Sequence, residues 1–344
     1  MSFSSILESS IFRYKFSPAA RSENHIRALG LFLTRRCNLR CIYCCLQVGQ
    51  DPPDKLTFAE IQSAIRQARE AGAQRLIIPG EGEPFLDENL FPIVDFAAGL
   101  RMKVRVFTNG LLIDRPTATH LFRRGVSLAI KFHALDAAAY DRLAGKRNAA
   151  EWEGYARMPA GMEKVSIPRN LKYLLEAGYV RSRRVPWEES LLQIESVITP
   201  QNVDQLPDLA RCCKEWDTDF MVETVIPAGK AVVGSPELSI TQERGEVLLR
   251  ELRKILGWKV GFRQKIRCTF ETNPFLDVSG NIRHCFGLAA NVGNIRDIPL
   301  MELHRREMAI RAERGLLSAP FSFGNKGFRY CATRRALDVA KDTQ

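Results

Sequence analysis

Three cysteines lie close together near the start of the chain, in the spacing Cys37-x3-Cys41-x2-Cys44. They follow ALGLFLT (28–34), a short apolar run that predicts a buried strand. In a reducing compartment, clustered thiols favour a metal centre over disulfides. A zinc ion takes a fourth protein ligand, and no histidine lies close in the sequence. A four-iron cluster instead accepts three cysteines, one on each of three irons. The spacing therefore favours a loop that wraps an iron–sulfur cluster, with a zinc knuckle as the alternative.

Nine cysteines occur in the chain, and most of the others fall into two groups. Cys212 and Cys213 lie in LPDLARCCKEW (206–216), whose apolar spacing predicts a helix that buries both thiols. A second group is spread over the last quarter of the chain: Cys268, Cys285 and Cys331.

Six apolar runs alternate with helical patterns through the first three quarters of the chain. The predicted strands are 28–34, 75–81, 103–109, 127–132, 190–199 and 219–227. The predicted helices are 57–72, 89–100, a short one from about 116, 165–178, 203–216 and 241–256, and residues 145–162 are predicted to be irregular. This alternation predicts βαβ units with a parallel sheet, either an open barrel or a doubly wound sheet.

In both of these architectures the active site lies at the carboxyl ends of the strands. The loops at those ends are the cysteine loop, GEGEP (80–84), TNG (108–110), FHALD (132–136), TPQN (199–202) and PAGK (227–230). We therefore expect the chemistry to lie in these loops.

The pattern changes after residue 257. FLDVSGNIRHCF (275–286) predicts two short strands around the turn Ser279-Gly280-Asn281, and PLMELHRREMAIRAER (299–314) predicts a helix. The segment is too short for a large core, so we expect a metal to stabilise it as a small separate module. The predicted domains are an N-terminal extension (1–27), a core domain (28–257) and a C-terminal module (258–344).

Composition excludes some classes of protein. Hydrophobic residues make up 45% of the chain, which is enough for a core and argues against a disordered protein. No apolar run approaches the roughly 20 residues of a membrane helix, and the N-terminal residues resemble no secretory signal, so we expect a cytoplasmic protein. The net charge of +11 is scattered in short clusters, which favours a solvated surface or a small anionic substrate over nucleic acid.

The segment CNLRCIYC (37–44) resembles the signature of the radical S-adenosylmethionine (radical SAM) family, including the aromatic residue, Tyr43, before the third cysteine. GEGEP (80–84) is similar to the family's Gly-Gly-Glu-Pro motif, with Glu81 in place of the second glycine. Thr108-Asn109-Gly110 matches a further family feature. The resemblance covers roughly residues 28–230. It implies a partial (βα)6 TIM-like barrel, followed by the cysteine-containing hairpin-helix module.

The resemblance also implies roles for individual residues. Cys37, Cys41 and Cys44 would hold a [4Fe-4S] cluster whose open iron chelates the amino and carboxylate groups of SAM. The residues implied in SAM binding are Tyr43, Gly80, Glu81, Gly82, Glu83, Thr108, Asn109, Lys131, Glu195 and Thr199. The last five are strand-end polar groups that could equally be solvated. Cys45 has no counterpart in the motif, and we expect it to be a packed bystander.

The family reaction needs an electron from a flavodoxin- or ferredoxin-type donor and yields a 5′-deoxyadenosyl radical that takes a hydrogen atom from a substrate carbon. The C-terminal module resembles the SPASM and Twitch extensions, which implies an auxiliary iron–sulfur cluster on Cys268, Cys285 and Cys331. A cluster that accepts an electron would lead to oxidation. A cysteine that returns a hydrogen atom, with Cys331 and Cys268 as candidates, would lead to epimerisation.

The substrate class is the least constrained prediction. Only 36 residues precede Cys37, too few for the peptide-binding domain of many peptide-modifying relatives. We therefore expect a small molecule such as a sugar, a cyclitol or a nucleotide conjugate. A peptide-modifying maturase is one alternative. A zinc or iron–sulfur module that binds RNA is an alternative from another class.

Overall fold

The computed structural model describes residues 24–46, 48–180, 190–225, 229–231, 237–257, 260–262, 273–285 and 288–313. It is an α/β fold that divides into two compact units, each built from separate stretches of chain. The β1–β3 unit takes the described residues of 19–37, 46–106 and 264–344, and the β4–β9 unit takes those of 38–45 and 107–263. The predicted boundary at residue 257 stays a prediction.

Parallel strands with crossover helices form the first part of the β1–β3 unit. Its elements are β1 (Ala28–Leu31), α2 (Phe58–Glu70), β2 (Arg75–Ile78), the 3-10 helix η2 (Pro84–Leu86), α3 (Leu90–Gly99) and β3 (Lys103–Thr108), whose last two residues belong to the other unit. β1 pairs with β2 and β2 with β3, all parallel, as the alternating pattern predicts.

A capping box begins α2 and also ties this helix to the C-terminal segment. Thr57 accepts a hydrogen bond from the Glu60 N–H, and the Glu60 carboxylate accepts one from the Thr57 N–H. The same carboxylate pairs with Arg296, at 3.1 Å from Nη2 to Oε2. The hydrogen bonds from Arg296 and from Thr57 lower the pKa of Glu60 to about 2.

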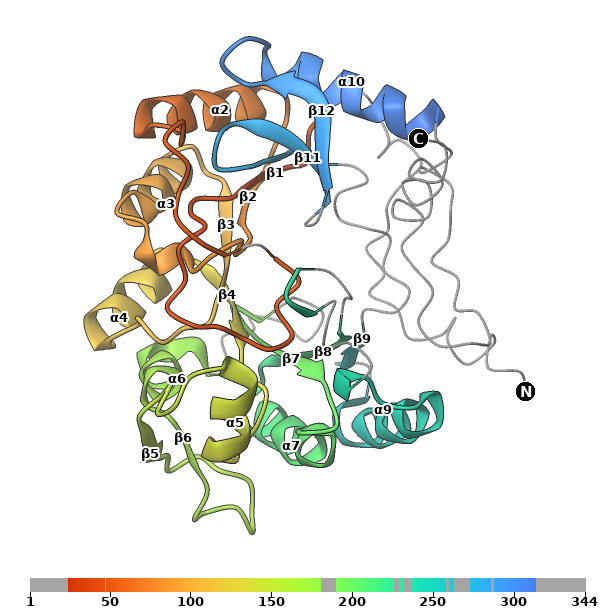
Figure 1. The fold of residues 1–344 in the computed structure, drawn as a ribbon. Coiled ribbons are helices and arrows are strands. Elements are labelled where there is room, and N and C mark those ends of the chain that lie inside the picture. The colour runs from red at the N-terminus through yellow and green to blue at the C-terminus, as the bar shows by residue number, and fades with distance from the viewer. Residues whose placement is uncertain are drawn as a thin grey trace. The chain divides into compact units, whose positions relative to one another are not determined.

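The predicted hairpin around Gly280 is present, and it pairs with β1. β10 (Phe275–Leu276) lies parallel to β1, and β11 (Asn281–Cys285) and β12 (Leu288–Asn294) follow antiparallel, so the hairpin continues the sheet of this unit. α10 (Leu300–Glu313) lies beside β11 and β12 (Figure 1). A β-carbon on Gly30 would lie 2.0 Å from the Phe275 ring, so the absence of a side chain there lets this strand pair with β1.

The β4–β9 unit contains a second run of parallel strands. Its elements are α4 (Arg115–Arg123), β4 (Ser127–Lys131), α5 (Ala137–Ala144), β5 (Trp152–Gly154), β6 (Ser166–Pro168), α6 (Arg169–Leu174), the π-helical turn η3 (Leu175–Tyr179), β7 (Leu192–Ile198), η4 (Val203–Gln205), α7 (Leu206–Trp216), β8 (Asp219–Thr224), α9 (Gln242–Leu256) and β9 (Val260–Phe262). The strand order is β4-β7-β8-β9, all parallel. α7 and α9 pack side by side (Figure 1).

The structure differs from the sequence prediction around residues 137–168. Helix α5 was not predicted, although Asp136 caps it and Gly145 ends it in the left-handed conformation. Residues 152–154 pair antiparallel with 166–168, so the helix predicted from 165 begins only at Arg169, after Pro168. Long-range pairing outweighs the local helical pattern here.

Cys212 and Cys213 are fully buried on α7, as its apolar spacing predicts. Within the described parts of the chain, no helix is long and apolar enough to cross a membrane.

Replacing Glu60 tests the link between α2 and Arg296. Glu60→Ala removes the capping contact and the ion pair, so we expect a loss of about 1–2 kcal/mol in the free energy of unfolding at pH 7. Glu60→Gln can still complete the capping box and should lower the free energy of unfolding less.

The contribution of Glu60 also depends on pH. Because the pKa of Glu60 is depressed in the folded protein, the ionised carboxylate stabilises the fold above about pH 4.5, and this contribution disappears as the pH falls towards 2. Urea denaturation of the apoprotein at pH 7 and at lower pH measures the difference. An unchanged gap between wild type and Glu60→Gln across that range would contradict the assignment.

Candidate functional site

Asp51 closes the base of the cysteine loop within the β1–β3 unit. Its carboxylate accepts hydrogen bonds from the Thr34 hydroxyl at 2.7 Å and from the Arg35 N–H at 2.7 Å. It also pairs with Arg36 at 3.1 Å and Lys55 at 3.3 Å. Burial alone would raise the pKa of Asp51, but these hydrogen bonds and the Lys55 charge outweigh it and lower the pKa. The carboxylate therefore stays ionised and holds the two ends of the loop together.

The GEGEP loop is bonded to the same stretch of chain. The Gly82 N–H donates to the Thr34 carbonyl at 2.9 Å, and the Glu83 N–H donates to the Arg36 carbonyl at 2.7 Å. A β-carbon on Gly82 would lie 2.1 Å from the Arg36 carbonyl oxygen. Only glycine permits this approach, so the spacing of the motif fixes the loop after β2 against the start of the cysteine loop.

The two acidic residues of GEGEP are held differently. Glu81 is 4% exposed and pairs with Arg283 at 3.1 Å and with Arg35 at 3.6 Å. Burial raises the pKa of Glu81, and the two arginines oppose that shift. Glu83 caps η2 by accepting from the Phe85 N–H at 3.2 Å. Glu81, which departs from the family motif, thus connects the GEGEP loop to β11. The roles of Gly80, Glu81, Gly82 and Glu83 in SAM binding stay predictions.

The other half of the cysteine loop, residues 38–45, belongs to the β4–β9 unit and is bound to the end of α5. The N–H groups of Arg40 and Ile42 donate to the carbonyls of Ala144 and Leu143, both at 3.1 Å. These carbonyls are among those that a helix leaves without an internal partner. The Cys44 carbonyl accepts from the Ala231 N–H at 3.1 Å. The unpredicted helix α5 is therefore a platform for the loop.

All six cysteines whose side chains are described are thiols, and the four of the loop are partly exposed. Cys37 ends one segment of the β1–β3 unit, and Cys41 and Cys44 lie in the other unit. Among the described residues, no three His, Cys, Asp or Glu side chains gather as ligands of one metal ion. Thiolates are ligands of zinc and of iron–sulfur clusters alike, so the predicted role of these cysteines stays a prediction. Burial raises the pKa of Cys45 to about 12, which keeps its thiol protonated.

Charged side chains form a group across β4, β7 and β8. Lys131 pairs with the fully buried Glu195 at 2.7 Å and with Glu223 at 3.4 Å. Gln193 donates to the other oxygen of Glu195 at 2.6 Å. The predicted residues Lys131 and Glu195 are therefore brought together, and Glu223 joins them without having been predicted. Their roles toward SAM stay predictions.

The strand ends are fixed by Asn202, which the sequence analysis did not single out within TPQN. Its side-chain oxygen accepts from the Thr199 N–H at 2.8 Å and from the Thr199 hydroxyl at 3.0 Å. Its amide donates to the carbonyls of His133 at 2.8 Å and Val197 at 2.9 Å. Asn202 is 1% exposed, so these bonds replace water for every group involved. The Thr199 hydroxyl is held by this network, and its predicted contact with SAM stays untested.

Thr108 ends β3, Asn109 follows it, and both side chains accept hydrogen bonds within the turn. The Thr108 hydroxyl accepts from the Gly110 N–H at 2.9 Å, and the Asn109 oxygen accepts from the Leu111 N–H at 3.0 Å. Asn109 also donates to the Asn38 side chain at 2.8 Å, which brings it to the cysteine loop.

Tyr43 contacts His133, a residue of FHALD that was not predicted as a site residue. The Tyr43 hydroxyl forms a hydrogen bond with His133 Nε2. The two rings pack edge to face, with their centroids 4.6 Å apart. Burial and the Lys131 charge lower the pKa of His133 to about 3, so its ring is neutral. Tyr43 also packs against an apolar cluster that contains Val197, Val225, Ala231 and Leu238.

The three C-terminal cysteines lie outside the described residues or at their edge. Cys268 and Cys331 lie outside the described residues, and Cys285 ends β11 with its side chain undescribed. The predicted auxiliary cluster and the predicted hydrogen-donor roles therefore stay predictions.

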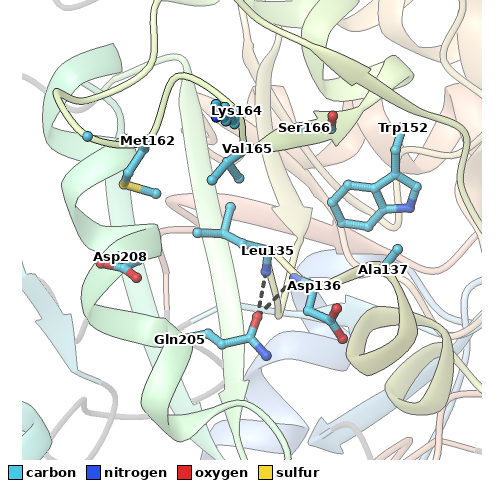
Figure 2. Close-up of a pocket in the computed structure, with 11 residues that line it drawn as sticks. Leu135, Asp136, Ala137, Trp152, Met162, Lys164, Val165, Ser166, Gln205 and Asp208 are labelled. Carbon is cyan, nitrogen blue, oxygen red and sulfur yellow. Dashed lines mark hydrogen bonds between the residues drawn. The ribbon is translucent and has the colours of Figure 1, made fainter.

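A groove of about 550 Å³ opens beside the start of α5 (Figure 2). It is lined by Leu135, Asp136, Trp152, Met162, Val165 and Gln205, among others. The Gln205 side chain accepts from the Leu135 and Asp136 N–H groups, at 3.0 and 2.9 Å (Figure 2). None of the lining residues is a predicted site residue, so we assign the groove no part in SAM chemistry.

The contact between Gly82 and Arg36 is testable. Gly82→Ala places a β-carbon in the space of a backbone oxygen. We therefore expect the free energy of unfolding to fall by about 1–3 kcal/mol and the affinity for SAM to weaken. Gly99→Ala, at the end of α3 in open space, is the matched control and should be neutral or slightly stabilising. Urea denaturation and equilibrium dialysis with SAM measure the two effects. Equal behaviour of both variants would refute the proposed role of this contact.

Comparisons with known proteins agree with the motifs. A sequence profile described as the Radical SAM superfamily matches residues 31–158. The GTP 3′,8-cyclase of Parasynechococcus marenigrum (strain WH8102) is 33% identical over 147 residues, 40% of this chain and 42% of that protein. The PqqA peptide cyclase of Bradyrhizobium diazoefficiens is 27% identical over 194 residues, 56% of this chain and 44% of that protein. The chain spans about half the length of the curated relatives that it matches first.

Two solved structures share the fold. SuiB of Streptococcus suis, bound to its precursor peptide SuiA, matches with a TM-score of 0.59 and 17% identity over 86% of this chain and 67% of that one. Native anSMEcpe, with bound AdoMet and the Cp18Cys peptide, matches with a TM-score of 0.57 and 13% identity over 92% of this chain and 100% of that one. The α/β fold is therefore the partial barrel that the motifs predict. With the cysteine signature in the loop after β1 and GEGEP bonded against it, residues 31–158 of this chain belong to the radical SAM superfamily.

Proposed function

We propose that the chain cleaves S-adenosylmethionine reductively, with a [4Fe-4S] cluster held by Cys37, Cys41 and Cys44. The observation that carries this proposal is the cysteine loop itself. It has three partly exposed thiols in the family spacing, and GEGEP is bonded to its first residues. The donor set fits the group, because thiolates are the usual ligands of iron–sulfur clusters. When bound, the cluster supplies the electron that cleaves SAM into methionine and a 5′-deoxyadenosyl radical.

The chain's own residues would position this chemistry. Asp51 neutralises part of the charge of Arg36 and Lys55 and keeps the start of the loop in one conformation. The backbone carbonyls of Gly80 and Gly82 are acceptors of the kind that the SAM ammonium group needs. Lys131 carries a positive charge that suits a carboxylate, although Glu195 and Glu223 share it. The buried His133 and Asn202 exclude water from the ends of β4 and β7, where a radical must be protected.

A peptide or protein side chain is the substrate class that we favour. SuiB and anSMEcpe, whose solved structures hold bound peptides, match most of this chain, and the PqqA peptide cyclase matches 56% of it. The small-molecule prediction depended on the few residues before Cys37, which say nothing firm about substrate size. The GTP 3′,8-cyclase supports a small molecule, but its match covers 40% of this chain. We also propose an auxiliary cluster on Cys268, Cys285 and Cys331, which suits an oxidised product.

Iron analysis tests the cluster assignment. After anaerobic reconstitution, we expect iron and sulfide in the wild type and a loss of about four irons in the Cys37/Cys41/Cys44→Ala variant. The matched control is Cys212→Ala, which removes a buried thiol of α7 and should keep all the iron. Wild-type protein with a reductant should convert SAM to 5′-deoxyadenosine, and the triple variant should not. Zinc without iron in the wild type would rule out the proposal.

Deuterium transfer tests the substrate class. Cells grown in deuterated medium supply two perdeuterated fractions, one of peptides and one of small metabolites. Each fraction is incubated anaerobically in ordinary water with enzyme, reductant and SAM. A peptide substrate predicts that deuterium enters 5′-deoxyadenosine from the peptide fraction, because the radical takes its hydrogen atom from the substrate. Transfer from the metabolite fraction alone would favour the small-molecule reading instead.

A further inference from the structure

Glu81 is a buried carboxylate of the β1–β3 unit, at the position where the family motif has its second glycine. Both of its arginine contacts are made by the oxygen Oε1. The other oxygen, Oε2, is buried and has no hydrogen-bond partner in the part of the chain that the structure describes. Because water does not reach this carboxylate, its charge must be compensated by the protein. The conformation of GEGEP therefore depends on the two arginines.

Arg283 supplies most of that compensation. Its Nη2 donates to Glu81 Oε1 at 3.1 Å, whereas Arg35 Nε lies 3.6 Å from the same oxygen. The Arg283 side chain is 11% exposed and that of Arg35 is 33% exposed, so water screens the charge of Arg35 more strongly. Arg283 is thus the main counter-charge of the GEGEP loop.

The β10–β11 hairpin places the Arg283 guanidinium. This group lies over the Phe32 ring, 5.6 Å from the ring centroid, and its Nε lies 3.7 Å from the Asp277 carboxylate. Asp277 is held by the hairpin turn, because its carboxylate accepts from the N–H groups of Ser279 at 3.0 Å and Asn281 at 2.9 Å. The guanidinium is therefore in position only when the hairpin is folded.

The ion pair lies directly beside the backbone contacts that hold GEGEP to the cysteine loop. Gly82 and Glu83, the two residues after Glu81, donate their N–H groups to carbonyls of residues 34 and 36. An uncompensated Glu81 would favour conformations in which its carboxylate reaches water. Those conformations would strain or break the adjacent backbone hydrogen bonds.

We propose that Arg283 is a positioning residue of the SAM site: its ion pair with Glu81 holds GEGEP in the conformation that binds SAM. The inference rests on the proposed function, since it takes GEGEP as a SAM-binding loop. It makes the C-terminal hairpin a part of that site, through a residue 202 positions further along the chain than Glu81. It also gives Glu81 a role that a glycine at this position does not have.

The test combines two measurements on the full-length, reconstituted protein. Equilibrium dialysis gives the dissociation constant of SAM, and amide hydrogen exchange without SAM reports on Gly82 and Glu83. Arg283→Met leaves Glu81 without its main counter-charge, so we expect the dissociation constant to rise about fivefold to tenfold and both amides to exchange faster. Arg283→Lys keeps the charge and should recover part of both effects.

A double variant separates the lost charge from the lost packing. Glu81→Gly combined with Arg283→Met removes both charges and restores the glycine of the family motif. Because no buried carboxylate then lacks a partner, this variant should bind SAM more tightly than Arg283→Met alone. Binding no tighter than that of Arg283→Met would contradict the proposal.

Arg296→Met is the matched control. Arg296 belongs to the same C-terminal segment but pairs with Glu60, on α2, instead of Glu81. Its replacement should leave the exchange of GEGEP and the affinity for SAM as they are in the wild type. If it weakens SAM binding as much as Arg283→Met does, general loosening of the segment explains the effect and the proposal is wrong.

Failure of this inference is distinguishable from failure of the proposed function. A reconstituted wild type that holds iron but binds no SAM overturns the proposed function. A wild type that binds SAM, with an affinity that Arg283→Met shares, overturns this inference alone. Faster exchange of GEGEP in Arg283→Met with unchanged affinity also overturns it, because the ion pair then stabilises the loop without affecting SAM.

Discussion

The carboxylate of Asp51 is the interaction on which the cysteine loop depends. The loop would have to hold three cluster ligands in place, and its shape depends on how its ends are held. Asp51 binds the backbone and side chains of residues 34–36 and also Lys55, which joins the departing and returning chain at one point. GEGEP then bonds to the same residues through Gly82 and Glu83. The family motif is thus a backbone contact as well as a set of polar groups.

In the β4–β9 unit, too, hydrogen bonds at the ends of helices and strands hold the loops in place. Helix α5 ends at a left-handed glycine, Gly145, and its last carbonyls receive the N–H groups of Arg40 and Ile42. Asn202 satisfies the polar groups at the ends of β4 and β7. The His133 ring accepts a hydrogen bond from the Val197 N–H and forms another with the Tyr43 hydroxyl. Each of these contacts uses a group that secondary structure leaves unpaired, which is why they gather at strand and helix ends.

The sequence predicted what depends on local spacing. Residues close to one another predict the cysteine signature, the helix that follows residue 57, the parallel strand–helix alternation and the burial of Cys212 and Cys213. Contacts between residues far apart in the sequence were not predicted. Asp51 and Asn202 are short polar residues in loops, where such residues are common, so no local pattern indicates that each forms several hydrogen bonds. The Glu81–Arg283 pair spans some 200 residues, and the departure of Glu81 from the family motif was its only local sign. The pairing of β10 with β1 was hidden because two residues of strand carry almost no pattern.

The central claim is that an iron of the loop's cluster binds SAM. The most direct measurement is electron–nuclear double resonance on the reduced protein with SAM labelled with nitrogen-15 in its amino group and oxygen-17 in its carboxylate. We expect hyperfine coupling of both labels to the cluster, because both groups would be ligands of the open iron. A reduced cluster with SAM bound but with no coupling from either label would contradict it.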